Sequence, residues 1–123
     1  MGLNLKKQSR YKWAKSGWIG IDLDATLAEY HGWDDGKIGK PIPKMLERVK
    51  KWIEEGQEVR IMTARAAGPQ ADIKVIEDWL EENGIGGLEI TNEKDFEMLL
   101  LYDDRCVQVE KNTGRIIGEE PEL

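Results

Sequence analysis

The fold is decided by one stretch, Trp18-Ile19-Gly20-Ile21-Asp22-Leu23-Asp24-Ala25-Thr26. In this stretch an apolar run leads into two carboxylates and a hydroxyl. The nearly continuous apolar run from Trp18 to Leu23 is typical of a central strand covered on both faces, so Asp22 is expected at its carboxyl end. Two carboxylates two residues apart repel each other, and a cation between them would offset that cost. Mg²⁺ is the natural candidate, because it is usually held by one or two carboxylates together with a substrate phosphate.

The same residues also have a plainer interpretation. Asp and Thr at the end of a strand are ordinary turn and helix-cap residues, and an isolated Asp-x-Asp-x-Thr often means no more than that. Reactive groups at the ends of other strands would decide between a turn and a site.

Size and composition predict one domain, since 123 residues are enough for one core and too few for two. The single cysteine, Cys106, cannot form an internal disulfide, and no stretch is long and apolar enough for a signal peptide or a membrane span. We therefore expect a cytoplasmic protein without a membrane partner.

The charge is distributed unevenly along the chain. The net charge is −6, yet residues 1–17 contain five basic and no acidic residues. The acidic remainder argues against a broad nucleic-acid surface, whereas the basic arm could contact nucleic-acid phosphates or simply stay solvated. We favour the solvated arm over residues 1–17, followed by a domain over 18–118 and an acidic tail over 119–123.

Predicted helices and strands alternate after the first strand. Apolar residues at helical spacing predict amphipathic helices after Lys44, closed by Gly56, and after Gly68-Pro69, closed by Asn83-Gly84. Strands are expected at 59–62, 88–90 and 98–102, and a terminal hairpin at 107–117.

This alternation predicts an α/β fold: an open, mainly parallel, Rossmann-like sheet flanked by helices, with a C-terminal β-hairpin. Ligands of such sheets bind outside the carboxyl ends of the strands. The residues expected at that edge are Asp22, Asp24, Thr63, Lys94, Asp103 and Asp104. Three apolar strands that each end in a different reactive group favour a site over turn chemistry.

Residues 29–43 are rich in Gly, Pro and aromatic residues and show no sustained period, which predicts a flap beside the carboxylates. Trp33 in this flap could stack a ring or base of a substrate, although it could equally be a surface residue. Arg65 follows Thr63 closely enough to reach a substrate, and pairing with a neighbouring acid is the alternative.

From Trp18 to about Arg105 the chain resembles the haloacid dehalogenase superfamily, specifically its aspartate-nucleophile phosphatases. The four motifs of that family correspond here to Asp22-Leu23-Asp24-Ala25-Thr26, Thr63, Lys94 and Asp103-Asp104. The resemblance implies that Asp22 is the nucleophile, that Asp24 is the general acid and base, and that Thr63 and Lys94 bind phosphate oxygens. It assigns Mg²⁺ to the Asp22 carboxylate, the Asp24 backbone carbonyl and Asp103, with Asp104 as a further ligand or close by.

The chemistry of the residues agrees with these roles. An aspartate is ionised at neutral pH and needs no base to attack phosphorus, so Asp22 could form an aspartyl-phosphate directly. Beside an ionised Asp22 and with limited solvent, the proton affinity of Asp24 is expected to be raised, which suits an acid and base.

Two features distinguish this chain within the resemblance. Ala25 stands where the family commonly has Gly, and a positive φ there would cost on the order of 1 kcal/mol. The gaps between the motifs are too short for a cap domain, so selectivity must come from the flap, from a neighbour in a homo-oligomer, or from a large substrate. Nucleotides, nucleic-acid ends, sugar phosphates and phosphoproteins all remain candidate substrates.

Two other functions stay open at this stage. A receiver-like phosphoacceptor uses similar groups, although in a different order along the chain. A non-catalytic regulatory module that keeps the phosphate site is the other alternative.

Overall fold

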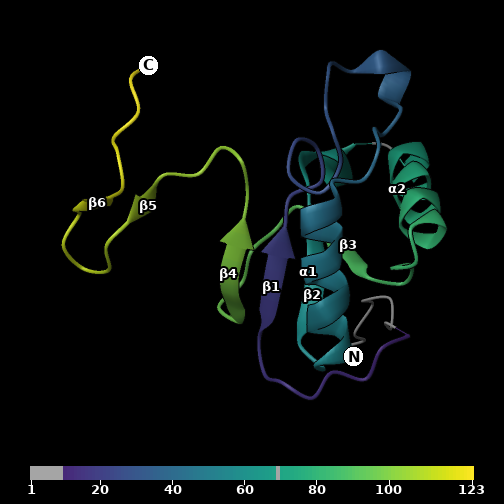
Figure 1. Ribbon diagram of the computed structural model, residues 1–123, viewed down its shortest axis with the longest axis horizontal. Helices are drawn as coiled ribbons and strands as arrows, with labels where there is room; N and C mark the ends of the chain where they lie inside the picture. Colours follow the sequence, from purple (N-terminus) through teal and green to yellow (C-terminus); the bar gives the residue numbers. More distant parts are fainter. Residues whose placement is uncertain (1–9, 69) are drawn as a thin grey trace.

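The computed structural model describes residues 10–68 and 70–123 of the chain (Figure 1). The strands are β1 (Trp18–Ile21), β2 (Glu58–Met62), β3 (Glu89–Thr91), β4 (Met98–Tyr102), β5 (Gln108–Val109) and β6 (Ile116–Ile117). The helices are α1 (Pro43–Glu54) and α2 (Gln70–Glu82), with short 3-10 helices η1 (Asp34–Gly36) and η2 (Ala64–Ala67).

The first four strands form one sheet in the order β3-β2-β1-β4, and all of its pairs are parallel. β5 and β6 form a separate antiparallel hairpin, which extends away from the rest of the chain in Figure 1. The predicted α/β fold, with an open parallel sheet, flanking helices and a terminal hairpin, is confirmed. The described residues contain no cap domain.

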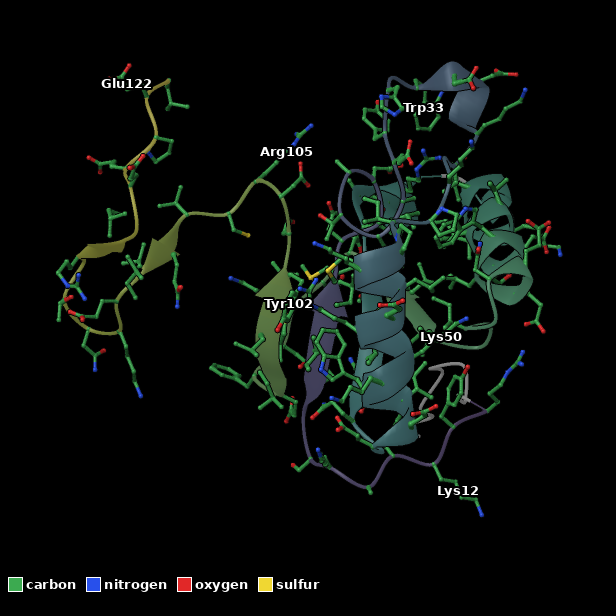
Figure 2. The ribbon with its side chains drawn as sticks, viewed as in Figure 1. Lys12, Trp33, Lys50, Tyr102, Arg105 and Glu122 are labelled. Carbon is green, nitrogen blue, oxygen red and sulfur yellow. The ribbon has the colours of Figure 1, made fainter. Side chains whose placement is uncertain are left out.

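Both helices cover the same face of the sheet, because the crossovers β1-α1-β2 and β2-α2-β3 run in the same direction. The side chains of Ile19, Ile21, Val59 and Ile61 alternate onto this face. They pack there with residues of both helices, namely Met45, Val49, Ile76, Trp79 and Leu80. Pairing with β2 and β4 places β1 in the middle of the sheet, with its carboxyl end pointing toward the flap that carries Trp33 (Figure 2).

The opposite face is crossed by the connection between β3 and β4, residues 92–97, which contains no helix. Asp95 in this connection accepts a hydrogen bond from the Trp18 indole at 2.7 Å. The Arg60 guanidinium lies 4.5 Å from the ring centroid of the same indole. A short polar crossing thus takes the place of a crossover helix.

β4 lies at the edge of the sheet and pairs only with β1 among the described strands. Its apolar residues are therefore less buried than those of β1, and Leu99 and Leu100 are each more than half exposed. β3 runs from Glu89 to Thr91, one residue later than predicted, and Leu88 before it is buried in the core.

The described part of the N-terminal arm, residues 10–17, is not solvated throughout: its basic side chains are exposed, whereas Tyr11 and Trp13 pack against the body. Tyr11 stacks on Trp13 at a centroid distance of 5.0 Å, and its hydroxyl donates to the Gly86 carbonyl at 2.9 Å. Arg10 forms an ion pair with Glu81 at 2.6 Å. The two aromatic rings explain the difference, since both pack partly buried against the core. Lys6 and Lys7 of the arm lie outside the described residues, and residues 119–123 carry no helix or strand.

Among the described residues, neither helix is long and apolar enough to cross a bilayer.

Candidate active site

Three carboxylates meet where β1 and β4 end. Asp22 directly follows β1, and its backbone N–H donates to the Tyr102 carbonyl at the end of β4, at 2.9 Å. This bond places Asp103 and Asp104, the next residues along the chain, beside Asp22. One oxygen from each of the three carboxylates lies within 4.8 Å of the others. The predicted meeting of the first and fourth motifs therefore has a defined geometry.

Thr26 holds this cluster together from the loop that follows β1. Its hydroxyl accepts a hydrogen bond from the backbone N–H of Asp104 at 3.1 Å and donates to Oδ1 of the same residue at 3.2 Å. It also lies 3.5 Å from Oδ2 of Asp22. A single hydroxyl thus connects the two strand ends, which limits how far the carboxylates can move apart.

The three carboxylates repel one another. Burial, a hydrogen bond to Asp104, and the charges of Asp103 and Asp104 together raise the pKa of Asp22 to about 7. The three carboxylates fit a hard divalent cation, because such ions take oxygen ligands and their charge would offset this repulsion. The side chain of Asp24 is not part of this group of oxygens.

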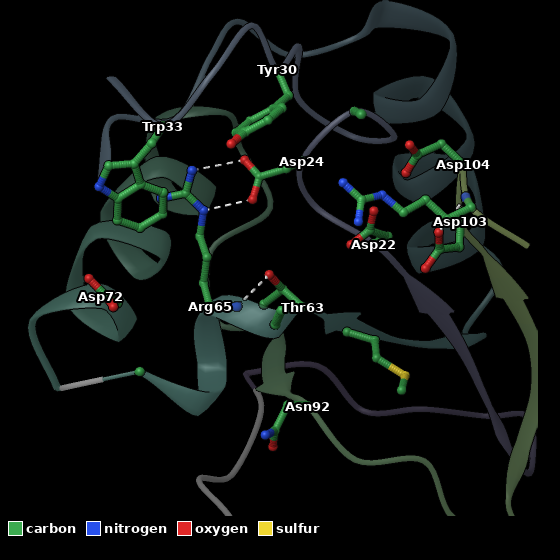
Figure 3. Close-up of a pocket in the computed structure, with 15 residues that line it drawn as sticks. Asp22, Asp24, Tyr30, Trp33, Thr63, Arg65, Asp72, Asn92, Asp103 and Asp104 are labelled. Atoms are coloured by element: carbon green, nitrogen blue, oxygen red, sulfur yellow. Dashed lines mark hydrogen bonds and ion pairs between the residues drawn. The ribbon is translucent and has the colours of Figure 1, made fainter. Parts of the chain in front are cut away.

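Asp24 instead forms a two-pronged ion pair with Arg65, which Figure 3 shows in the middle of the pocket. Nε and Nη2 of Arg65 donate to the two carboxylate oxygens at 2.7 and 2.9 Å, and Nη1 donates to the Gly36 carbonyl at 2.7 Å. Arg65 is only 7% exposed. Of the two interpretations given for Arg65, the structure shows pairing with an acid, although at a buried rather than an exposed position.

Trp33 completes this arrangement from the flap. Its ring centroid lies 4.8 Å from Cζ of Arg65, the distance of a cation–π contact. The flap is anchored at its base, where the Trp79 indole of α2 donates to the Gly39 carbonyl at 2.9 Å. A side chain on Gly39 would collide with the backbone of Glu29, so this crossing of the two flap segments requires glycine.

Thr63 follows β2 and lines the pocket, as predicted for the second motif. Its hydroxyl accepts the backbone N–H of Arg65 at 3.1 Å, which caps η2. Thr63 therefore caps η2 and also lines the pocket.

Lys94 does not line the pocket and is exposed. It precedes Asp95, which bonds to the side chain of Trp18, the first residue of β1, so the connection has already left the carboxyl edge. The cationic side chains that line the pocket among the described residues are those of Arg65 and Arg105. Sequence reasoning missed Arg105, although its place directly after Asp103-Asp104 was a usable signal.

The pocket between the strand ends and the flap has a volume of about 580 Å³. The predicted site residues that line it are Asp22, Asp24, Trp33, Thr63, Arg65, Asp103 and Asp104. Residues that sequence reasoning did not select include Tyr30, Asp72, Asn92 and Arg105.

Ala25 has a φ of 70°, in the left-handed region that favours glycine, so the strain expected for a positive φ at this residue applies. Its backbone N–H donates to the Ala28 carbonyl at 2.8 Å and closes the tight loop around the carboxylates.

We expect Ala25→Gly to raise the free energy of unfolding by about 0.5 kcal/mol, because relief of the left-handed strain exceeds the added entropy of the unfolded chain. Ala28→Gly is the matched control. It makes the same change in the same loop at a buried residue without a positive φ and should destabilise the protein by about 1 kcal/mol. Urea denaturation of both variants measures the difference, and equal destabilisation by both would refute strain at Ala25.

Comparisons with known proteins provide information only about the fold. No known family model matches the chain, and the search of curated proteins also finds no match. A solved structure of a conserved protein from Bacteroides thetaiotaomicron matches with a TM-score of 0.60 and 19% identity, over 76% of this chain and 79% of that one. At this identity the likeness supports the α/β architecture and carries no statement about activity.

Proposed function

We propose that the chain is a Mg²⁺-dependent phosphomonoesterase of the haloacid dehalogenase type that works through an aspartyl-phosphate on Asp22. The observation that carries the proposal is the meeting of Asp22, at the end of the central strand, with Asp103 and Asp104 within 4.8 Å at one edge of an open pocket. Ligands of open α/β sheets bind at this edge. A structural turn would not require three carboxylates to converge there.

In the first step an oxygen of Asp22 attacks the phosphorus, and the bond from phosphorus to the substrate's ester oxygen breaks. The leaving oxygen takes a proton from Asp24. In the second step Asp24 accepts a proton from water as the water oxygen bonds to phosphorus, which releases phosphate and regenerates the Asp22 carboxylate. To donate the first proton, Asp24 must itself carry one when the substrate is bound, and for either transfer it must free one of the two oxygens now bonded to Arg65.

The ligands proposed for Mg²⁺ are the carboxylates of Asp22 and Asp103 and the backbone carbonyl of Asp24, with Asp104 as a further ligand or close by. When bound, the ion supplies positive charge against the repulsion between Asp22 and the phosphate. The Thr63 hydroxyl is the proposed donor to a phosphate oxygen. Arg105, which lines the pocket, is a better placed cation for a second oxygen than Lys94.

Phosphate release from an aryl phosphate tests the proposal. The protein should hydrolyse the substrate with Mg²⁺, lose at least about 100-fold of this activity in excess EDTA, and regain it when Mg²⁺ is restored. Asp103→Asn and Asp104→Asn should each raise the Mg²⁺ concentration needed for half-maximal activity, the direct ligand by the larger factor. Asp78→Asn, an exposed acid of α2, is the control and should not change it.

A phosphoacceptor module is the second candidate, and the pairing of Asp24 with Arg65 is the observation that favours it. If Asp24 cannot leave the arginine, no base activates water and a phosphorylated Asp22 persists. A stable phosphoprotein after treatment with acetyl phosphate, without turnover of any monoester, would replace the first proposal by this one.

A further inference from the structure

We infer that Trp33 and Tyr30 of the flap form the ring-binding half of the pocket, so the substrate is a phosphorylated nucleoside, a phosphate monoester that carries a planar base. This inference rests on the proposed function, because it places the phosphate of that substrate at Asp22.

The first argument is the exposure of two aromatic side chains at the site. Trp33 is 53% exposed and Tyr30 40% exposed, and both line the pocket that contains the three carboxylates. Large aromatic side chains are strongly stabilised by burial, and exposed ones within a pocket are typical of ligand contacts. A flap that served only to exclude solvent would bury them against the sheet.

The second argument is the fixed orientation of the Trp33 indole. The Arg65 guanidinium stacks on this ring and is itself held by the Asp24 carboxylate and the Gly36 carbonyl. Gly36 also lies against the edge of the indole, where a Cβ would be 3.4 Å from Cζ2. The ring is therefore oriented before a ligand arrives, and a stacked base would meet it with little further loss of side-chain entropy.

The third argument is the layout of the pocket. In Figure 3 Trp33 lies at one end, Asp103 and Asp104 lie at the other, and Asp22 and Asp24 lie between them. A phosphorylated nucleoside has the same order of groups: a phosphate at one end, a sugar in the middle and a planar base at the other. The open pocket would accept such a molecule along its length.

Asp72 adds a polar preference at the Trp33 end. This carboxylate lines the pocket from the first turn of α2, where its negative charge also interacts favourably with the helix dipole. It repels anionic ring substituents and can accept hydrogen bonds from amino or ring N–H groups. A base with N–H donors fits this end better than a carboxylated ring.

Turnover of a matched pair of substrates tests the inference. A nucleoside 5′-monophosphate and ribose 5-phosphate share the phosphate and the sugar and differ in the base. We expect kcat/KM of the wild-type protein to be about 10- to 100-fold higher for the nucleotide, which corresponds to the free energy gained when one base stacks on an aromatic side chain. Nucleoside 3′-monophosphates and a short oligonucleotide phosphorylated at its 5′ or 3′ end show whether the protein prefers a free nucleotide or the terminal nucleotide of a nucleic acid. A higher kcat/KM for either of these substrate types than for ribose 5-phosphate supports the inference.

Substitution of Trp33 assigns this preference to the indole. Trp33→Leu should lower the ratio of the two kcat/KM values about 10-fold, and Trp33→Phe, which keeps a ring, should retain most of it. Phe96→Leu is the control, since Phe96 is fully exposed and does not line the pocket. Equal kcat/KM for both substrates, unchanged by Trp33→Leu, would overturn the ring-binding inference and leave the phosphatase proposal standing.

Binding separates the two proposals if the protein hydrolyses neither substrate. Calorimetric titration of the Asp22→Asn variant with the nucleoside 5′-monophosphate, in the presence of Mg²⁺, requires no turnover. Tighter binding than in the Asp22→Asn/Trp33→Leu double variant would support the ring site, and equal affinity of the two proteins would refute it.

Discussion

Replacement of Asp22 by asparagine should abolish turnover and, at the same time, stabilise the metal-free protein at pH 8. Both effects follow from one feature, a carboxylate held beside Asp103 and Asp104 at the end of a buried strand. The charge that makes Asp22 a nucleophile is also disfavoured by burial and by the neighbouring carboxylates.

The loss of activity should be at least about 10⁴-fold, since removal of a catalytic nucleophile typically costs 10⁴ to 10⁶ in kcat. A neutral amide cannot attack phosphorus as a carboxylate does, and it offers a divalent ion a weaker ligand. Phosphate release from an aryl phosphate measures the change. Turnover in Asp22→Asn at one tenth of the wild-type rate would reject Asp22 as the nucleophile.

The effect on stability has a definite pH window. The folded protein raises the pKa of Asp22 from 3.8 to about 7, so between these values the folded state binds more protons than the unfolded state. The titration of Asp22 therefore lowers the free energy of unfolding of the wild type from about pH 4 to about pH 7. Above pH 7 this contribution stays constant. Asp22→Asn has no such titration, so its advantage over the wild type should be larger at pH 8 than at pH 4.

Urea denaturation in EDTA at both pH values measures this difference. Other titrating groups largely cancel, because they are common to the two proteins. Mg²⁺ should stabilise the wild type more at pH 8 than at pH 5, because the ion competes with the proton on Asp22, and it should stabilise Asp22→Asn less. A variant that is less stable than the wild type at pH 8 in EDTA would contradict the charge repulsion in the cluster.

The carboxylate cluster could be predicted from the sequence because it depends on backbone topology. Apolar runs that end in Asp22 and in Asp103-Asp104 predict two parallel strands, and the carboxyl ends of parallel strands meet at one edge. The same logic failed to place Lys94 in the pocket. A lysine in a connection has no strand to fix its direction, and residues 92–97 turn away toward Trp18 at the other end of β1.

The partner of Asp24 could not be read from the sequence with the same certainty. Arg65 follows β2 and is separated from Asp24 by 41 residues, so their pairing depends on side-chain rotamers and on where the flap crosses. The exposure of β4 is a similar case. The run Met98–Tyr102 is apolar enough for a central strand, yet the order of strands in the sheet places it at the edge.

Arg65→Ala should be the second severe substitution, with effects on stability and on turnover. The side chain of Arg65 is 5% exposed, and its loss leaves the Asp24 carboxylate, which is 23% exposed, without its cation. Removal of one partner of a buried ion pair typically costs about 3–5 kcal/mol, and the partial exposure of Asp24 reduces our expectation to about 2–3 kcal/mol. Arg48→Ala, at an exposed residue of α1, is the control and should stay within about 0.5 kcal/mol of the wild type.

Turnover should fall as well, because Arg65 positions both Asp24 and the flap through the Gly36 carbonyl. We expect a loss of about 100-fold in kcat with a smaller change in KM, since Asp24 acts on the leaving oxygen and on water rather than in substrate binding. Arg65→Lys keeps the charge but cannot form the two-pronged pair or stack flat on Trp33, so it should restore stability more than kcat. If Arg65→Ala retained the wild-type kcat and lost only stability, Arg65 would be a structural residue, and Asp24 would exchange protons independently of it.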